Sequence, residues 1–199
     1  MYAMDTTGQR LARVVTEVLS PAVVAVALPL AVAWHATGYD ALATAGWGVV
    51  VAIFFCVLPM AFLVRGARRG RWEGHWVRDR AHRTVPLLVC LASALAGMAV
   101  MLIGGAPREL VALAWAMIIT LAACLVITRW WKVSVHATVA GGAVAMLAVV
   151  YGPWLLALAL LVALVCWARV AIEDHTAAQV VVGAALGPVV GGAVFLVLS

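Results

Sequence analysis

The sequence predicts an all-α integral membrane protein, built as a bundle of six or seven transmembrane helices. Apolar residues make up 67% of the 199 residues, charged residues only 11%, and the mean hydropathy is +1.14. A soluble domain carries roughly a quarter charged residues, and a chain of this length has too little interior to bury so much apolar surface. We therefore expect the excess to face lipid. This excludes a secreted domain, a disordered chain, an ordinary cytosolic enzyme and a nucleic-acid-binding domain.

Apolar runs of the right length for spans follow one another along the whole chain. A helix needs roughly 20 apolar residues to cross the hydrocarbon core. The candidate runs are 18–37, 43–64, 85–104, 109–128, 133–151, 153–171 and 176–198. Most connections are short and hold Gly, Pro or charged residues. We expect residues 1–199 to form a single membrane domain, with 1–17 as an amphipathic lead-in and 65–83 as a basic loop.

The basic residues are distributed unevenly between the two sides that seven crossings would define. Twelve of the thirteen Lys and Arg residues fall on the side of the N-terminus and the 65–83 loop, and Arg108 falls on the other. Cytoplasmic loops carry the excess of Lys and Arg in membrane proteins. The sequence thus predicts that the basic side is cytoplasmic and that the protein resides in a cell membrane of bacterial type.

Two histidines on the basic side are the best candidates for chemistry, because ionisable residues near a span are costly and often functional. His136 and His175 each lie where an apolar run begins. Gln179 follows His175 by four residues, so on a helix its amide oxygen is expected to accept a hydrogen bond from one ring nitrogen. A helix N-terminus favours an anion, and Arg169 lies six residues before His175. These features predict a phosphate site; the alternative is a polar network that pins helix ends.

The remaining histidines and the cysteines give weaker signals. His35 is interpreted as interfacial, and His75 and His82 as solvated residues of the basic loop. All four cysteines lie inside apolar runs without a CxxC pair, which favours packing over a disulfide framework or a zinc site. We expect neither a metal nor a cofactor, and nothing in the sequence sets an oligomeric state.

Three segments resemble the signatures of the type 2 phosphatidic-acid phosphatase superfamily, the lipid phosphate phosphatases. Residues 169–179, with Arg, His and Gln at 169, 175 and 179, resemble the third signature, Ser-Arg-x5-His-x3-Asp. Residues 134–136, Ser-Val-His, resemble the second, Pro-Ser-Gly-His. Residues 83–86, Arg-Thr-Val-Pro, resemble a degraded first signature, Lys-x6-Arg-Pro. The order and separations cover the chain from about residue 65 to its end.

The resemblance implies a metal-independent phosphatase acting on a lipid phosphate or an isoprenoid (di)phosphate among the lipids of the membrane. His175 would attack phosphorus and form a phosphohistidine, oriented by Gln179, and His136 would protonate the leaving alkoxide. Arg83, Ser134 and Arg169 would hold the phosphate. Such an assignment agrees with the demands of phosphoryl transfer, which needs positioning and positive charge around the phosphoryl oxygens.

The first-signature lysine is missing, and other basic residues are expected to supply its charge: Lys132, Arg78 and Arg80. A second alignment, Arg71-x6-Arg78, keeps the spacing but has Asp79 where the signature has proline.

Departures from the signatures leave two other functions open. Gln179 replaces an aspartate, and it can fix a histidine tautomer but cannot stabilise an imidazolium by charge. One alternative is therefore a non-hydrolytic membrane protein that binds lipid phosphates. The other is a prenyl-diphosphate transferase or cyclase, which would hold Mg²⁺ through carboxylates such as Asp79, Glu173 and Asp174.

Overall fold

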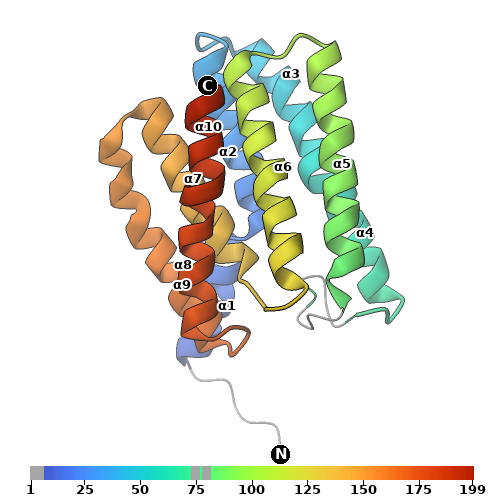
Figure 1. The fold of residues 1–199 in the computed structure, drawn as a ribbon, viewed down its shortest axis with the longest axis vertical. Coiled ribbons are helices and arrows are strands. Elements are labelled where there is room, and N and C mark those ends of the chain that lie inside the picture. Colours follow the sequence, from blue (N-terminus) through green and yellow to red (C-terminus); the bar gives the residue numbers. More distant parts are fainter. Residues whose placement is uncertain (1–6, 73–76, 78–81) are drawn as a thin grey trace, which may run out of the picture.

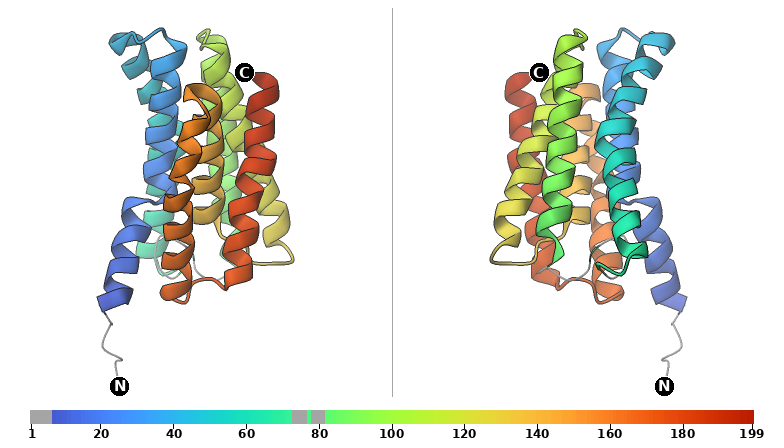
Figure 2. Two further views of the ribbon diagram at one scale, coloured as in Figure 1. Left: turned by 90° about the vertical axis from the view of Figure 1, so that its left-hand side faces the viewer. Right: turned by 90° about the vertical axis from the view of Figure 1, so that its right-hand side faces the viewer.

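The computed structural model describes residues 7–72, 77 and 82–199, and within these residues the chain is helical, without a strand. The helices lie side by side along one axis (Figures 1 and 2). Their bounds are α1 Thr7–Val18, α2 Pro21–Ala36, α3 Ala41–Val51, η1 Ala52–Val57, α4 Leu58–Arg68, α5 Thr84–Ile103, α6 Arg108–Thr128, α7 Val135–Tyr151, η3 Pro153–Leu158, α8 Ala159–Ala171, α9 Ala177–Leu186, η4 Gly187–Gly192 and α10 Ala193–Leu198.

The expected membrane bundle is confirmed. Among the described residues, five continuous helices are long and apolar enough to cross a membrane: 41–68, 84–103, 108–128, 153–171 and 177–198. A sixth span results if α1 and α2, which meet at a bend of 42°, cross together. The expected run 133–151 forms α7, whose 17 residues make it shorter than the roughly 20 residues of a full crossing.

Side-chain caps fix where several helices begin. Ser20, Asp40, Ser134 and Thr176 each stand in extended backbone just before a helix, and each side-chain oxygen accepts the N–H of the residue three positions on. The first N–H groups of a helix have no hydrogen-bond acceptor within the helix. These caps supply an acceptor for one such donor at each helix start. The caps of α7 and α9 also fix the starts of two helices next to the candidate histidines, since His136 lies in the first turn of α7 and His175 directly precedes the cap of α9.

Two spans contain a widened, π-helical turn, and a proline accompanies each. In the span 41–68 the turn is η1, followed by Pro59, and in the span 177–198 it is η4, which contains Pro188. Proline has no N–H to donate and its ring crowds the carbonyl four residues before it. A widened turn is one way for a helix to continue past such a position.

α7 is the central helix of the polar half, and it contacts α2, α8, α9 and η4. Glycines permit its close approach to the last span. A Cβ on Gly187 would clash with the backbone carbonyl of Thr138, and one on Gly183 would lie 2.7 Å from the Ser134 carbonyl oxygen. Small residues at such crossings bring helix backbones together in membrane proteins.

The apolar core lies toward the end of the bundle where α5 ends and α6 begins. It is formed by buried residues of α2, α3, α5, α6, α7 and α10, including Val32, Met101, Leu113, Met146 and Phe195. The opposite end, which holds the starts of α5, α7 and α9 and the end of α8, is left for the polar residues (Figure 1). The fold thereby separates an apolar end from a polar one.

Substitution Gly187→Ala is expected to destabilise the protein by about 1–3 kcal/mol, because the added methyl meets the α7 backbone and the crossing must open. The control is Gly46→Ala, since nothing lies within 4 Å of a Cβ at Gly46 and alanine favours a helix more than glycine does. Unfolding in detergent by a denaturing-surfactant titration measures both. Equal stability of the two variants would contradict the close packing of α7 on η4.

Candidate functional site

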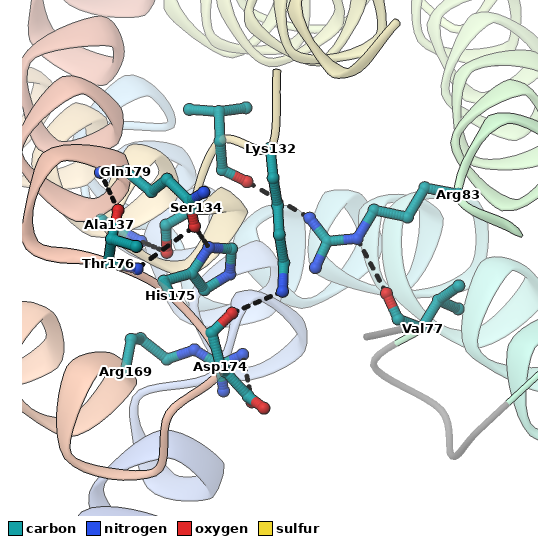
Figure 3. A network of polar contacts seen from close by, with 11 residues as sticks. Val77, Arg83, Lys132, Ser134, Ala137, Arg169, Asp174, His175, Thr176 and Gln179 are labelled. Atoms are coloured by element: carbon teal, nitrogen blue, oxygen red, sulfur yellow. Dashed lines mark hydrogen bonds and ion pairs between the residues drawn. The ribbon is translucent and has the colours of Figure 1, made fainter. Parts of the chain in front are cut away.

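The described residues of the three signature-like segments come together at the polar end of the bundle. Arg83 precedes α5, Lys132 and Ser134 lie in the α6–α7 connection, and Arg169 ends α8. His175 lies in the α8–α9 turn (Figure 3). His136 and Gln179 belong to the first turns of α7 and α9. Residues separated by almost a hundred positions in the sequence thus share one site.

The α8–α9 turn explains the spacing of Arg169 and His175. Glu173 adopts a left-handed conformation, with φ of 59°, which reverses the chain after α8. The backbone N–H of His175 then donates to the carbonyl oxygen of Arg169 at 3.1 Å. This bond closes the loop, so Arg169 and His175 are both buried while Glu173 stays exposed.

The predicted contact between His175 and Gln179 is present: Nδ1 of His175 lies 3.1 Å from Oε1 of Gln179. The same oxygen accepts the backbone N–H of Thr176 at 3.2 Å, and the Thr176 hydroxyl accepts the N–H of Gln179, forming a capping box. Because Oε1 is an acceptor, it selects the tautomer in which Nδ1 carries the proton. Nε2 then bears the lone pair, which is the arrangement a nucleophilic imidazole requires.

Arg83 and Lys132 approach His175 from the opposite side (Figure 3). Arg83 is buried, and its Nε and Nη1 donate to the carbonyl oxygens of Val77 at 2.8 Å and Val133 at 3.2 Å. Lys132 donates from Nζ to the Asp174 carbonyl oxygen at 2.5 Å. Backbone carbonyl oxygens thus help to orient both cations.

Asp174 is the residue of this site that sequence reasoning did not assign to it. Its Oδ2 forms an ion pair with Nη2 of Arg169 at 2.7 Å, and both side chains are buried, with exposures of 6% and 2%. The sequence analysis named Asp174 only as a possible Mg²⁺ ligand. The sequence did hold a signal for this contact. A buried carboxylate needs a partner, and Arg169 is close to Asp174 in a chain with few charged residues.

Ser134 and His136 are buried at the start of α7. The Ser134 hydroxyl accepts the Ala137 N–H at 3.4 Å and therefore acts as the helix cap. The Ser134 backbone N–H donates to the Gln179 carbonyl oxygen at 3.3 Å, which joins the α7 start to α9. The second signature-like segment is in this way tied directly to the third.

An apolar cavity of about 240 Å³ opens from the site into the bundle. Arg83, His136, Arg169 and His175 line its polar end. Most of the remaining wall is apolar and comes from α2, η1, α4, α5, α6 and α7, for example Leu28, Phe55, Met60, Leu87, Met117 and Met146. The cavity therefore has a charged end and a long apolar wall.

The structure does not assign every candidate residue to this site. Arg78 and Arg80, and also His75, fall outside the described residues. His35 lies where α2 ends, in the half of the bundle away from the site, and its Nδ1 is 3.0 Å from Oε2 of Glu109. Within the described part of the chain, no group of three or more His, Cys, Asp or Glu side chains is arranged to hold a metal ion.

The electrostatic environment keeps His175 neutral. Burial lowers the pKa of His175 to about 3, and the neighbouring cations Arg83, Arg169 and Lys132 act in the same direction. The hydrogen bond to Gln179 opposes this shift. A neutral imidazole retains its lone pair at every pH that a cell experiences, so His175 is suited to act as a nucleophile or as a hydrogen-bond acceptor.

No protein-family model, no curated protein and no solved structure matches this chain.

The depressed pKa of His175 makes stability depend on pH. The unfolded chain takes up a proton near pH 6.5, whereas the folded protein does so only near pH 3, so the unfolded state binds more protons between these values. The free energy of unfolding should fall with decreasing pH across this window, by about 2 kcal/mol between pH 7 and pH 5. Denaturant titrations from pH 5 to pH 8 measure it.

The test variant is His175→Gln and its control is His82→Gln. His82 is an exposed histidine at the same end of the bundle. His175→Gln should flatten the pH dependence over this window, while His82→Gln should retain it. An unchanged slope in His175→Gln would show that another group is responsible.

Proposed function

We propose that the protein is a metal-independent membrane phosphatase that hydrolyses a lipid phosphate or an isoprenoid (di)phosphate through a phosphohistidine. The observation that carries the proposal is a neutral histidine, oriented by Gln179, at the cationic end of an apolar cavity. Arg83 and Arg169 line the same end. The cavity suits a ligand with an anionic head and an apolar tail, and this chemistry agrees with the resemblance to the lipid phosphate phosphatases.

In the first step, Nε2 of His175 attacks phosphorus and the bond from phosphorus to the lipid oxygen breaks. Protonated His136 gives its proton to the leaving oxygen, which departs as an alcohol or as the remaining phosphate of a diphosphate. In the second step, His136 accepts a proton from water as that water attacks phosphorus. Inorganic phosphate leaves, and His175 regains its neutral state.

The cations contribute by charge. Arg83, Lys132 and Arg169 surround His175, and their field stabilises the negative charge of the phosphoryl oxygens in the transition state. Burial, together with the same field, keeps His175 unprotonated before the phosphate arrives. Ser134 contributes through structure, because its hydroxyl caps α7 and so fixes the position of His136.

A second function is favoured by one specific observation. The partner of His175 is a neutral amide whose oxygen also accepts the Thr176 N–H, so it does not compensate a positive charge that develops on the imidazole. A protein that binds lipid phosphates without hydrolysing them would tolerate this arrangement. The Asp174 carboxylate, by contrast, lies in an ion pair with Arg169, which does not favour the Mg²⁺-dependent transferase.

Phosphate release tests the proposal. The purified protein should release inorganic phosphate from a panel of lipid monophosphates and isoprenoid diphosphates in the presence of EDTA, and acid-labile phosphate should be trapped on the protein during turnover. His175→Ala should abolish release and trapping. His35→Ala, which removes a histidine from the other half of the bundle, should leave both intact.

Label that persists in His175→Ala but disappears in His136→Ala would exchange the two roles. Binding of the lipids without any release by the parent protein would establish the non-hydrolytic function instead.

We propose further that the site faces the cytoplasm, because the Lys and Arg residues are distributed unevenly between the two sides of the membrane. A cysteine at exposed His82, near the site, should resist a membrane-impermeant maleimide added to intact cells. A cysteine at exposed Leu42, at the other end of the bundle, should react. The labelling of each variant is compared with that of the parent protein, whose four native cysteines lie within helices. The reverse labelling pattern would place the site on the outer face.

A further inference from the structure

The apolar cavity has a definite depth, because its lining residues stop at comparable heights on neighbouring helices. On α7 the lining extends from His136 to Met146, ten residues further along the helix. An α-helix rises about 1.5 Å per residue, so this distance is about 15 Å. On α2, α5 and α6 the lining residues farthest from the site lie near the middle of each helix, at Leu28, Ala94 and Met117. The cavity therefore reaches from the polar end to about the middle of the bundle.

The far end of the cavity is closed by the apolar core. Leu28, Ala94 and Met146 line the cavity and also belong to the core cluster, so we call these three residues the cavity floor. Side chains four residues apart lie on the same face of a helix. The residues four positions beyond Leu28 and Ala94 are Val32 and Met98, which are buried in the core with exposures of 0% and 3%. The cavity is therefore blind at its far end.

A lipid phosphate in this cavity would be positioned at both ends. Its head would lie among the polar residues of the mouth, which include Arg169 and His175, and its tail would point toward the floor. An extended chain advances about 1.2 Å per bond, as the extended polypeptide backbone does, so about 15 Å holds about twelve chain atoms or about three isoprene units. The depth of the cavity thus corresponds to a particular tail length.

The choice between tail lengths depends on fit rather than on the hydrophobic effect. Lipid tails are as apolar as the cavity wall, so a methylene gains little burial when it moves from the bilayer into the cavity. A tail shorter than the cavity leaves a void at the floor, whose side chains lose dispersion contacts. A longer tail meets close-packed core residues and must bend or displace them, which costs free energy. Binding should therefore be tightest at one tail length.

We infer that the cavity floor selects the tail of the substrate, so that the preferred ligand is a lipid phosphate whose extended tail has about twelve chain atoms, as in a dodecyl or a farnesyl chain. The inference rests on the proposed function and deepens it by naming the class of tail. Ala94 and Met146 lie at the floor, away from the reacting atoms. They are therefore specificity-determining residues rather than catalytic ones.

Competition among five alkylphosphonates tests this inference, because their carbon–phosphorus bond resists hydrolysis. The purified protein, in a sterol-based detergent that has no alkyl tail, is equilibrated with an equimolar mixture of octyl-, decyl-, dodecyl-, tetradecyl- and hexadecylphosphonate. Native mass spectrometry then gives the amount of each ligand that is bound. The parent protein should bind dodecylphosphonate best.

Two substitutions at the floor should move this optimum in opposite directions. Ala94→Leu adds a longer side chain to the floor and should favour decylphosphonate, whereas Met146→Ala deepens the cavity and should favour tetradecylphosphonate. In each variant the ratio of the newly favoured ligand to dodecylphosphonate should rise about fivefold or more, the effect of about one methylene in a packed interior. A general loss of stability would not produce opposite shifts, and either variant suffices if the other does not fold.

The controls make the same substitutions outside the cavity lining. Ala96→Leu adds the same side chain at an exposed position of α5, and Met101→Ala removes a buried methionine about two turns beyond Ala94. Both controls should retain the optimum of the parent protein.

Other results would overturn the inference. Binding by the parent that increases steadily up to hexadecylphosphonate, or that does not depend on tail length, would remove the selection by the floor and leave the phosphate site in place. The same conclusion follows if both floor variants keep the optimum of the parent, or if the controls shift it equally. If the parent binds none of the five phosphonates, the proposed phosphate site itself fails, and the inference fails with it.

Discussion

The polar end of the molecule depends on the α8–α9 turn. The His175 N–H donates to the Arg169 carbonyl, the Asp174 side chain pairs with Arg169, and the Asp174 carbonyl accepts from Lys132. One short segment thereby joins the end of α8, the start of α9 and the α6–α7 connection. Because these groups are buried, each bond replaces hydration that the folded protein has given up. Each of these bonds fixes the position of a group that makes another of them, so the turn behaves as a single unit.

Charge and burial act on His175 together. The cations that suit a phosphate also prevent protonation of the imidazole, and burial acts in the same direction. An anion bound beside these cations would offset their field and raise the affinity of His175 for a proton. Binding of such an anion and protonation of His175 would therefore be coupled, in the sense that each would favour the other.

Hydropathy predicted the helical runs well, because lipid imposes a simple requirement on length and polarity. The His175–Gln179 contact was also predictable, since it depends only on helical spacing and on the start of α9. The Arg169–Asp174 ion pair was only partly predictable: the two residues lie close in the sequence, but no local pattern indicates the left-handed Glu173 between them, where the chain turns. The assignment of Ser134 to phosphate binding came from a signature and stays a prediction, while its hydroxyl oxygen caps α7. The resemblance to the phosphatases supplied the roles of the histidines, and these stay a prediction.

The widened turns also govern how the face of a span relates to its sequence. A π-helical turn takes more residues than an α-helical one, so the residues beyond η1 are rotated about the helix axis relative to an uninterrupted helix. The lipid-facing and cavity-facing positions of α3 and α4 therefore do not follow a single 3.6-residue period, although Ala41–Arg68 forms one continuous span. Alignments of this span with other sequences should accordingly permit a one-residue gap within Ala52–Val57, where the helix can absorb an insertion without ending.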